Sequence, residues 1–406
     1  MLRKVTPIAI TACLLIMVAA VAVPYPQEEK EYKDRAEYDL LSKVYAETDP
    51  TKKLALLDEW TEKYAETDWH LERTQFYLDS YRKTNQSEKA VATANELLGK
   101  IPGDFTSNYT ITLLSPYLGK SDADTLSAAT KASKDLLAGM DKQFATKPEN
   151  VTQEAWDDAR KQAETSAHKT VGWSAMQSKD NVEAEKSFTE ALKLDPTQAQ
   201  ISYWLGDVVM KQKDVKKNDL AMFSFARAAV YDGPNAMPPE GRQQVADYVK
   251  NLLKSYAGDV GVSEYWPRLE AMAKASAFPT AELDFESKEQ LAYNAEKKAR
   301  DENPLLYKYL DLKTVLTGAT GDATWGDLRG KLTPKMALYV ISAAPAARPS
   351  TINLSSKPGG EVEVVLTLEN RRRDPVGTGR KLTIDGVAVT LTKAPFKLVL
   401  NDGHTF

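Results

Sequence analysis

The sequence predicts a mainly α-helical chain, a solenoid of helix hairpins, followed by a small antiparallel β-barrel or sandwich domain. Turn signals recur at helix-length intervals between residues 30 and 315. They include Asp49-Pro50, Pro102-Gly103, Asp195-Pro196 and Gly233-Pro234. From residue 337 to 401 the apolar residues alternate with period two, which is typical of half-buried strands. A hydrophobic fraction of 42% over 406 residues is enough for at least two cores.

The N-terminus has the pattern of a secretory signal. Arg3 and Lys4 precede an apolar run over residues 8–23, and Ala20-Val21-Ala22 offers an A-x-A cleavage site. We therefore expect residues 1–22 to be a signal peptide. The run of about 16 residues is slightly shorter than a bilayer span, so an uncleaved N-terminal anchor is the alternative, with lipidation at Cys13 as a third reading. Cleavage would leave no cysteine, which favours the periplasm or an extracellular, envelope-associated location in bacteria.

The clearest repeated unit ends at Pro196. Counting back from it, Ala191 stands five residues before, Phe188 eight before, Ala184 twelve before and Gly172 twenty-four before. These spacings resemble those of the tetratricopeptide repeat (TPR) family. The resemblance implies that Gly172 and Ala184 let the two helices of one hairpin approach closely. It also implies that Phe188 and Ala191 pack into the next repeat.

Further copies flank this unit. The following copy has Leu205-Gly206, Ala221, Phe225 and Ala228 in the same order, and an earlier copy has Tyr77, Tyr81, Ala90, Ala94 and Leu97. The earlier copy departs from the pattern because Leu78 stands where glycine is expected. We expect residues 28–315 to form the TPR and TPR-like array, with helices over about 240–256 and 264–276 continuing or capping it.

In the TPR family, fixed positions on the first helix of each hairpin line a concave groove that holds the partner. The resemblance carries these positions onto Lys169, Trp173, Met176, Gln177, Tyr203, Asp207 and Met210. The earlier copy adds Gln75, Asp79 and Arg82. A subfamily that grips a C-terminal carboxylate needs Asn where this chain has Trp173, so the resemblance favours an apolar segment of another protein as ligand. The alternative is that these aromatics pack in the core between repeats.

The C-terminal part changes character. Residues 304–315 are predicted to be the last helix, residues 316–334 a Gly-rich connector, and residues 335–406 an independent β domain. Six short strands are expected, at 337–342, 350–355, 361–368, 380–385, 387–392 and 396–401. Asp385-Gly386 is predicted to form a type I′ hairpin turn. An OB-like barrel would fit this pattern.

Composition excludes several kinds of site. The chain has 53 basic and 57 acidic residues, so it exerts no global attraction on nucleic acid. One cysteine and three histidines are too few for Cys/His zinc clusters or a disulfide framework. No nucleophile motif or phosphate loop occurs. We therefore expect no enzyme, no cofactor and no metal.

One local charge cluster flanks the turn residues 374–379. It consists of Arg371, Arg372, Arg373, Arg380 and Lys381. A solvated hairpin loop is the simpler interpretation, and a patch for anions is the other.

Two functions remain. The first is a non-enzymatic protein–protein interaction scaffold of the bacterial envelope, which binds its partner in the concave TPR groove. The alternative is an accessory ligand-binding protein, in which the β domain recognises a glycan, a lipid head group or another anion.

Overall fold

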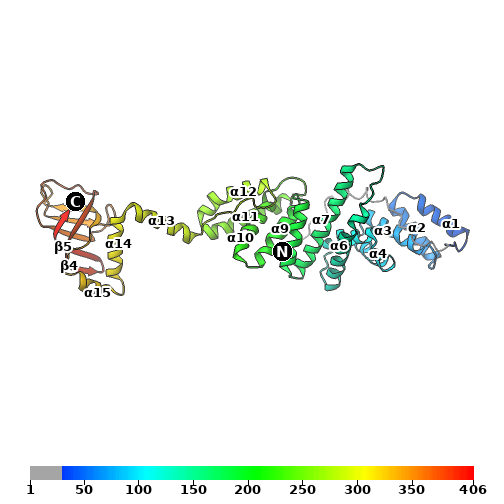
Figure 1. Cartoon of the computed structure of the whole chain (residues 1–406), viewed down its shortest axis with the longest axis horizontal. Helices are drawn as coiled ribbons and strands as arrows, with labels where there is room; N and C mark the ends of the chain where they lie inside the picture. Colours follow the sequence, from blue (N-terminus) through cyan, green and yellow to red (C-terminus); the bar gives the residue numbers. More distant parts are fainter. Residues whose placement is uncertain (1–29) are drawn as a thin grey trace. The chain divides into compact units, whose positions relative to one another are not determined.

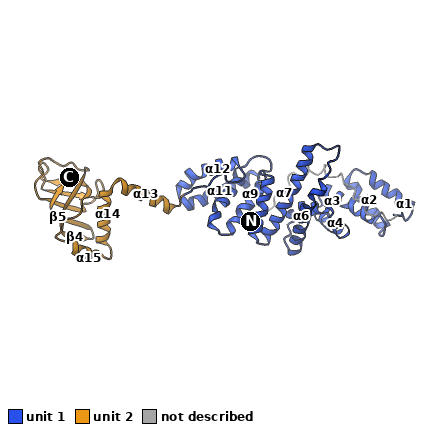
Figure 2. Ribbon diagram, in the orientation of Figure 1, with its two compact units in different colours: residues 1–285 blue, residues 286–406 orange. Residues whose placement is uncertain are grey.

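The computed structural model describes residues 30–406, which divide into two compact units at Phe285 and Glu286 (Figure 2). The predicted signal segment, residues 1–22, lies outside the described residues, and so does Cys13. Within residues 30–406, no helix combines the length and the apolar character that crossing a membrane would require.

The first unit is built of α-helices, and Figure 1 shows them following one another in chain order. Most helices pack against their neighbours in the chain, whereas α12 packs on α10. Its α-helices are α1 (Arg35–Ala46), α2 (Pro50–Lys63), α3 (His70–Lys83), α4 (Ser87–Lys100), α5 (Phe105–Leu114), α6 (Ala123–Gln143), α7 (Gln153–Gln177), α8 (Asn181–Leu194), α9 (Ala199–Lys211), α10 (Asn218–Val230), α11 (Pro239–Ala257) and α12 (Trp266–Ala275). The short turns η1 (Ser115–Tyr117), η2 (Val215–Lys217) and η3 (Gly261–Tyr265) connect some of them. The helices predicted near 240–256 and 264–276 are confirmed as α11 and α12.

Side-chain caps define several helix starts. Asp34 Oδ1 accepts a hydrogen bond from Glu37 N at 2.9 Å, and Asp180 Oδ1 accepts one from Glu183 N at 3.1 Å. Thr152 caps α7 in the same way. Each cap satisfies an otherwise unpaired amide of the first turn and contributes about 1 kcal/mol. Local side-chain hydrogen bonds therefore define the starts of α1, α7 and α8.

The packing of two hairpins confirms the repeat register. A Cβ atom on Gly172 in α7 would lie 2.6 Å from Cδ1 of Phe188 in α8. The equivalent atom on Gly206 in α9 would lie 2.9 Å from Cδ1 of Phe225 in α10. Only glycine permits so close an approach, since real Cβ contacts are longer. The first unit is thus a TPR-like array of helix hairpins.

The second unit is a closed five-stranded barrel with helices packed on it. Its elements are α13 (Lys288–Glu302), α14 (Pro304–Thr317), α15 (Gly321–Leu328), β1 (Met336–Ala344), β2 (Thr351–Ser355), β3 (Val364–Leu368), β4 (Lys381–Lys393) and β5 (Phe396–Thr405). The strand order is β1-β2-β3-β5-β4, and β4 pairs with β1 to close the barrel. The pairs are antiparallel except β3 with β5, which is parallel.

The predicted hairpin at Asp385-Gly386 is wrong. Both residues lie inside the single strand β4, so the two strands expected at 380–385 and 387–392 are one. A Cβ on Gly386 would lie 3.0 Å from Leu400 Cβ on β5, and the β4–β5 register shifts between Asp385 and Val387. The glycine therefore serves a bulge and a close strand approach rather than a turn.

The boundary between the units also differs from the predicted one at residue 315. Tyr309 of α14 is fully buried with the barrel core, and Trp325 and Leu328 of α15 pack on the same core. Lys313 Nζ donates to Glu363 Oε1 at 2.5 Å and so ties α14 to the barrel. The predicted last helix and part of the predicted connector thus belong to the β unit. Periodicity shows that a helix has an apolar face but not which core that face joins.

Candidate partner-binding face

The residues predicted to bind a partner lie on two neighbouring helices. Helix α7 carries Lys169, Trp173, Met176 and Gln177, and α9 carries Tyr203, Asp207 and Met210. Lys169 and Tyr203 are 34 residues apart, one TPR period, so they hold equivalent places on successive hairpins. Gln177 is exposed, whereas the others except Trp173 are half-buried.

Trp173 does not line an open groove, and the alternative that these aromatics pack in the core holds for this residue. Its side chain is 6% exposed and packs with Leu126 and Ala129 of α6. Helix α6 is 21 residues long, and these two residues lie in its first half, where they cover the indole. Trp173 is therefore a core residue between hairpins.

Lys169 contacts an exposed tyrosine, Tyr117, that the sequence pattern did not indicate. Its Nζ donates to Tyr117 Oη at 2.5 Å and lies 4.8 Å from the centre of the Tyr117 ring. Tyr117 is 57% exposed. It ends the short turn η1 in a segment that matches the TPR pattern poorly, so the repeat frame could not assign it a role.

Tyr203 belongs to a chain of aromatic contacts. Its ring meets Phe225 edge-on at 5.6 Å between centroids, and Phe225 meets Tyr248 of α11 edge-on at 5.3 Å. Tyr248 is 44% exposed. Burial raises the pKa of Tyr203, and the charges of Asp207 and Tyr248 raise it further. Tyr203 is thus a neutral hydroxyl donor at ordinary pH.

The other predicted residues are partly engaged. Asp207 forms an ion pair with Lys211 at 2.6 Å along α9. Met176 and Met210 pack at the edge of the core formed by α8, α9 and α10. Lys169 and Tyr203 hold equivalent places on successive hairpins, and together with their neighbours Tyr117 and Tyr248 we call them the tyrosine face. Tyrosine supplies a large apolar contact area with a polar tip, the combination that protein interfaces favour.

A hollow lies next to the predicted residues of α7. It has a volume of about 650 Å³ and is lined by α6, the end of α7 and the start of α8. Ser174 lines it, and the Ser174 Oγ is buried without a hydrogen-bond partner within residues 30–406. None of the seven predicted partner-binding residues lines this hollow.

The basic cluster of the barrel is divided among separate neighbours. Arg371 and Arg373 are exposed, whereas the Arg372 side chain donates to Thr405 Oγ1. Lys381 Nζ donates to Asn303 Oδ1 at 2.5 Å, and Arg380 is exposed. Among the described residues, no hydrogen-bond acceptor is shared by the side chains of these five cations. Whether they act together on an anion stays a prediction.

A histidine joins two carboxylates near the end of β5. His404 Nδ1 lies 2.7 Å from Asp385 Oδ1, and His404 Nε2 lies 3.0 Å from Glu369 Oε2. Hydrogen bonds to Asp385 and to Glu369 raise the pKa of His404. Within the described part of the chain, no group of three or more His, Cys, Asp or Glu side chains could hold a metal ion.

Comparisons with known proteins add two similar solved structures. No protein-family model matches the chain, and no curated protein matches it. The MamA RS-1 ArsTM double mutant is 13% identical with a TM-score of 0.33, over 47% of this chain and 89% of that one. TTC0263, a thermophilic TPR protein in Thermus thermophilus, is 15% identical with a TM-score of 0.29, over 52% of this chain and 97% of that one. The TPR-like description of the first unit rests on the packing at Gly172 and Gly206.

Proposed function

We propose that the protein is an interaction scaffold whose helical unit binds a segment of another protein on the tyrosine face. The observation that carries the proposal is the exposure of two tyrosines, Tyr117 at 57% beside Lys169 and Tyr248 at 44% in the aromatic cluster of Tyr203. Their rings keep a large area in water, which a bound apolar segment would remove.

The ring arrangement supports this role. Phe225 holds Tyr203 and Tyr248 in fixed edge-on contacts, and Lys169 lies over the ring of Tyr117. Little side-chain freedom is then lost when a partner docks, because the rings are already positioned. Aromatic anchors of this kind commonly contribute about 2 kcal/mol or more each to binding.

Site-specific photo-crosslinking in the native host tests the proposal. A photoreactive residue at Gln177 samples the neighbourhood of the tyrosine face, and one at the exposed Lys193 of α8 is the matched control. We expect a discrete partner protein crosslinked from Gln177 and not from Lys193. With that partner purified, Tyr117→Ala should weaken binding by about 2 kcal/mol.

A third photoreactive position, Arg373 on the barrel, decides between the two functions. Crosslinks to lipid or glycan from Arg373, with none to protein from Gln177, would support the ligand-binding alternative and refute the scaffold. Equal crosslinking from Gln177 and Lys193 would show that the tyrosine face has no special role.

We propose further that the protein is exported and works in the bacterial envelope. The proposal rests on the apolar run and the A-x-A site at Ala20-Val21-Ala22. N-terminal sequencing of the protein from its host should find Val23 first. An intact N-terminus in the membrane fraction would favour the retained anchor, and an intact N-terminus in the cytoplasm would refute export.

A further inference from the structure

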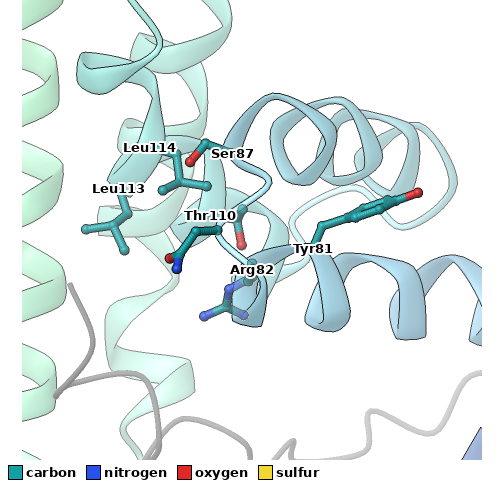
Figure 3. A pocket seen from close by; sticks show the side chains of 7 residues that line it. Tyr81, Arg82, Ser87, Thr110, Leu113 and Leu114 are labelled. Carbon is teal, nitrogen blue, oxygen red and sulfur yellow. The ribbon is translucent and has the colours of Figure 1, made fainter. Parts of the chain in front are cut away.

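A small hollow lies between the end of α3, the start of α4 and α5 (Figure 3). It is lined by Tyr81, Arg82, Asn85, Ser87, Thr110, Leu113 and Leu114. Its volume is about 30 Å³, room for roughly two water-sized groups. The hollow therefore suits the end group of a ligand and is too small for a whole molecule.

Arg82 lacks the partners that other half-buried or buried arginines of this unit have. Arg227 donates to the carbonyl oxygens of Ala273, Lys274 and Pro196. Arg73 likewise donates to backbone carbonyls. The half-buried Arg82 side chain has no hydrogen bond and no ion pair with any residue from 30 to 406. Its guanidinium nitrogens are not among the buried side-chain atoms that lack a partner in the described residues, so their N–H donors are accessible to a ligand.

The nearby carboxylates are already engaged. Asp79 pairs with Lys83 at 2.7 Å, and Asp104 accepts a hydrogen bond from Ser107 N at 2.7 Å as the cap of α5. Burial lowers the pKa of Arg82, although Asp79, Tyr109 and Asp104 act to raise it. The guanidinium thus stays charged and keeps its donors available.

Two neutral polar groups line the same hollow. The side chains of Asn85 and Ser87 have no hydrogen-bond partner among the described residues. Asn85 has a φ of 57°, the left-handed conformation of the tight turn between α3 and α4. Leu113 and Leu114 form the apolar wall. A cation with a forked set of donors, an amide and a hydroxyl around a small hollow match a planar carboxylate.

We infer that this hollow binds a carboxylate group of a protein partner, with Arg82 as the charge partner and Ser87 as a second donor. The inference rests on the proposed scaffold function and names one chemical feature of the partner. In the repeat frame Arg82 holds the place that Met176 and Met210 hold on α7 and α9, so the hollow belongs to the same succession of first helices. The carboxylate is either an acidic side chain or a chain terminus.

Titration of the full chain, observed by NMR at the Arg82 Nε–Hε resonance, tests the inference. The probes are acetate, acetyl-Ala-Glu-Ala-amide, acetyl-Ala-Ala-Ala with a free C-terminus, acetyl-Ala-Gln-Ala-amide and inorganic phosphate. We expect saturable shifts with roughly millimolar dissociation constants for acetate and for at least one of the two carboxylate peptides. The neutral glutamine peptide should cause none. The tighter of the two carboxylate peptides identifies the source.

Three variants make the result specific, read through backbone amides of the α3–α4 turn. Arg82→Gln should weaken acetate binding at least about tenfold, and Ser87→Ala about threefold or more. Lys83→Gln, one residue away on the exposed side, should stay within about twofold. If Arg82→Gln fails to fold, Ser87→Ala decides alone.

Absence of a saturable shift, equal effects of Arg82→Gln and Lys83→Gln, or phosphate binding more tightly than acetate would overturn the inference. These failures are distinct from failure of the scaffold proposal. Crosslinking from Gln177 does not depend on the hollow, and the acetate titration needs no partner protein.

Discussion

Replacing Gly172 by alanine tests the helix contact on which the TPR-like packing depends. The added Cβ would lie 2.6 Å from Cδ1 and Cε1 of Phe188, whose side chain is fully buried. The ring cannot move aside freely, because its surroundings are closely packed. Overpacking of this kind costs about 1 to 3 kcal/mol. Alanine also favours the helix by about 1 kcal/mol over glycine, which hides part of the cost.

A matched control separates the two effects. Gly139 lies inside α6, and a Cβ there would meet nothing within 4 Å. Gly139→Ala should therefore gain the helix term alone. The difference between the two variants isolates the overpacking, about 1 to 3 kcal/mol, which corresponds to roughly 2 to 12 °C in melting temperature.

Thermal unfolding followed by circular dichroism measures this difference. The double variant Gly172→Ala with Phe188→Leu should recover part of the loss, since the smaller side chain leaves room for the new methyl group. If Gly172→Ala proves as stable as Gly139→Ala, the close approach of α7 and α8 is refuted, and the repeat register with it.

Three further outcomes are expected. Trp173→Ala should destabilise the helical unit by about 3 to 5 kcal/mol in denaturant unfolding, because the indole is buried. A loss of stability under about 1 kcal/mol would contradict the burial of Trp173. The pKa of His404 is raised in the folded barrel, so the stabilisation by protonated His404 is full below about pH 6.5 and is lost as the pH rises through the folded pKa. His404→Gln should remove that pH dependence of the melting temperature. An unchanged profile would contradict the pairing of His404 with Asp385 and Glu369. The fragment 304–406 should fold by heteronuclear NMR, whereas 335–406 should not, because it lacks Tyr309; a folded shorter fragment would show that α14 is dispensable.

The sequence was sufficient for the repeat register and for the change from helices to strands. The spacing of Gly172 and Phe188 in the sequence predicts a close contact between the two helices of one hairpin, and the structure has that contact. Alternation near 361–368 and 396–401 likewise predicted β3 and β5, because a half-buried strand must alternate its side chains.

Other features depend on contacts that local pattern does not encode. Trp173 has a groove position in the family pattern, but Leu126 in the first half of α6 packs on the indole and covers it. Asp385-Gly386 has the composition of a hairpin turn, yet the approach of Leu400 requires a glycine within a strand. The repeat pattern gave no role to Tyr117, because the contact of Tyr117 is with Lys169 on a different helix. The sequence predicted only a groove position for Arg82, because the lack of a hydrogen-bond or ion-pair partner among residues 30–406 can be seen only in the three-dimensional structure.

The place of β5 in the barrel has a consequence for how the protein is made. It is the last strand in chain order, yet it lies between β3 and β4 and supplies the fully buried Leu398 and Leu400. While a ribosome is still adding residues before Phe396, β3 and β4 each present an unpaired edge, the kind of edge on which chains aggregate. The barrel can close only after synthesis of this strand, so a chain that stalls shortly before it is an aggregation-prone product and a natural target for proteolytic quality control.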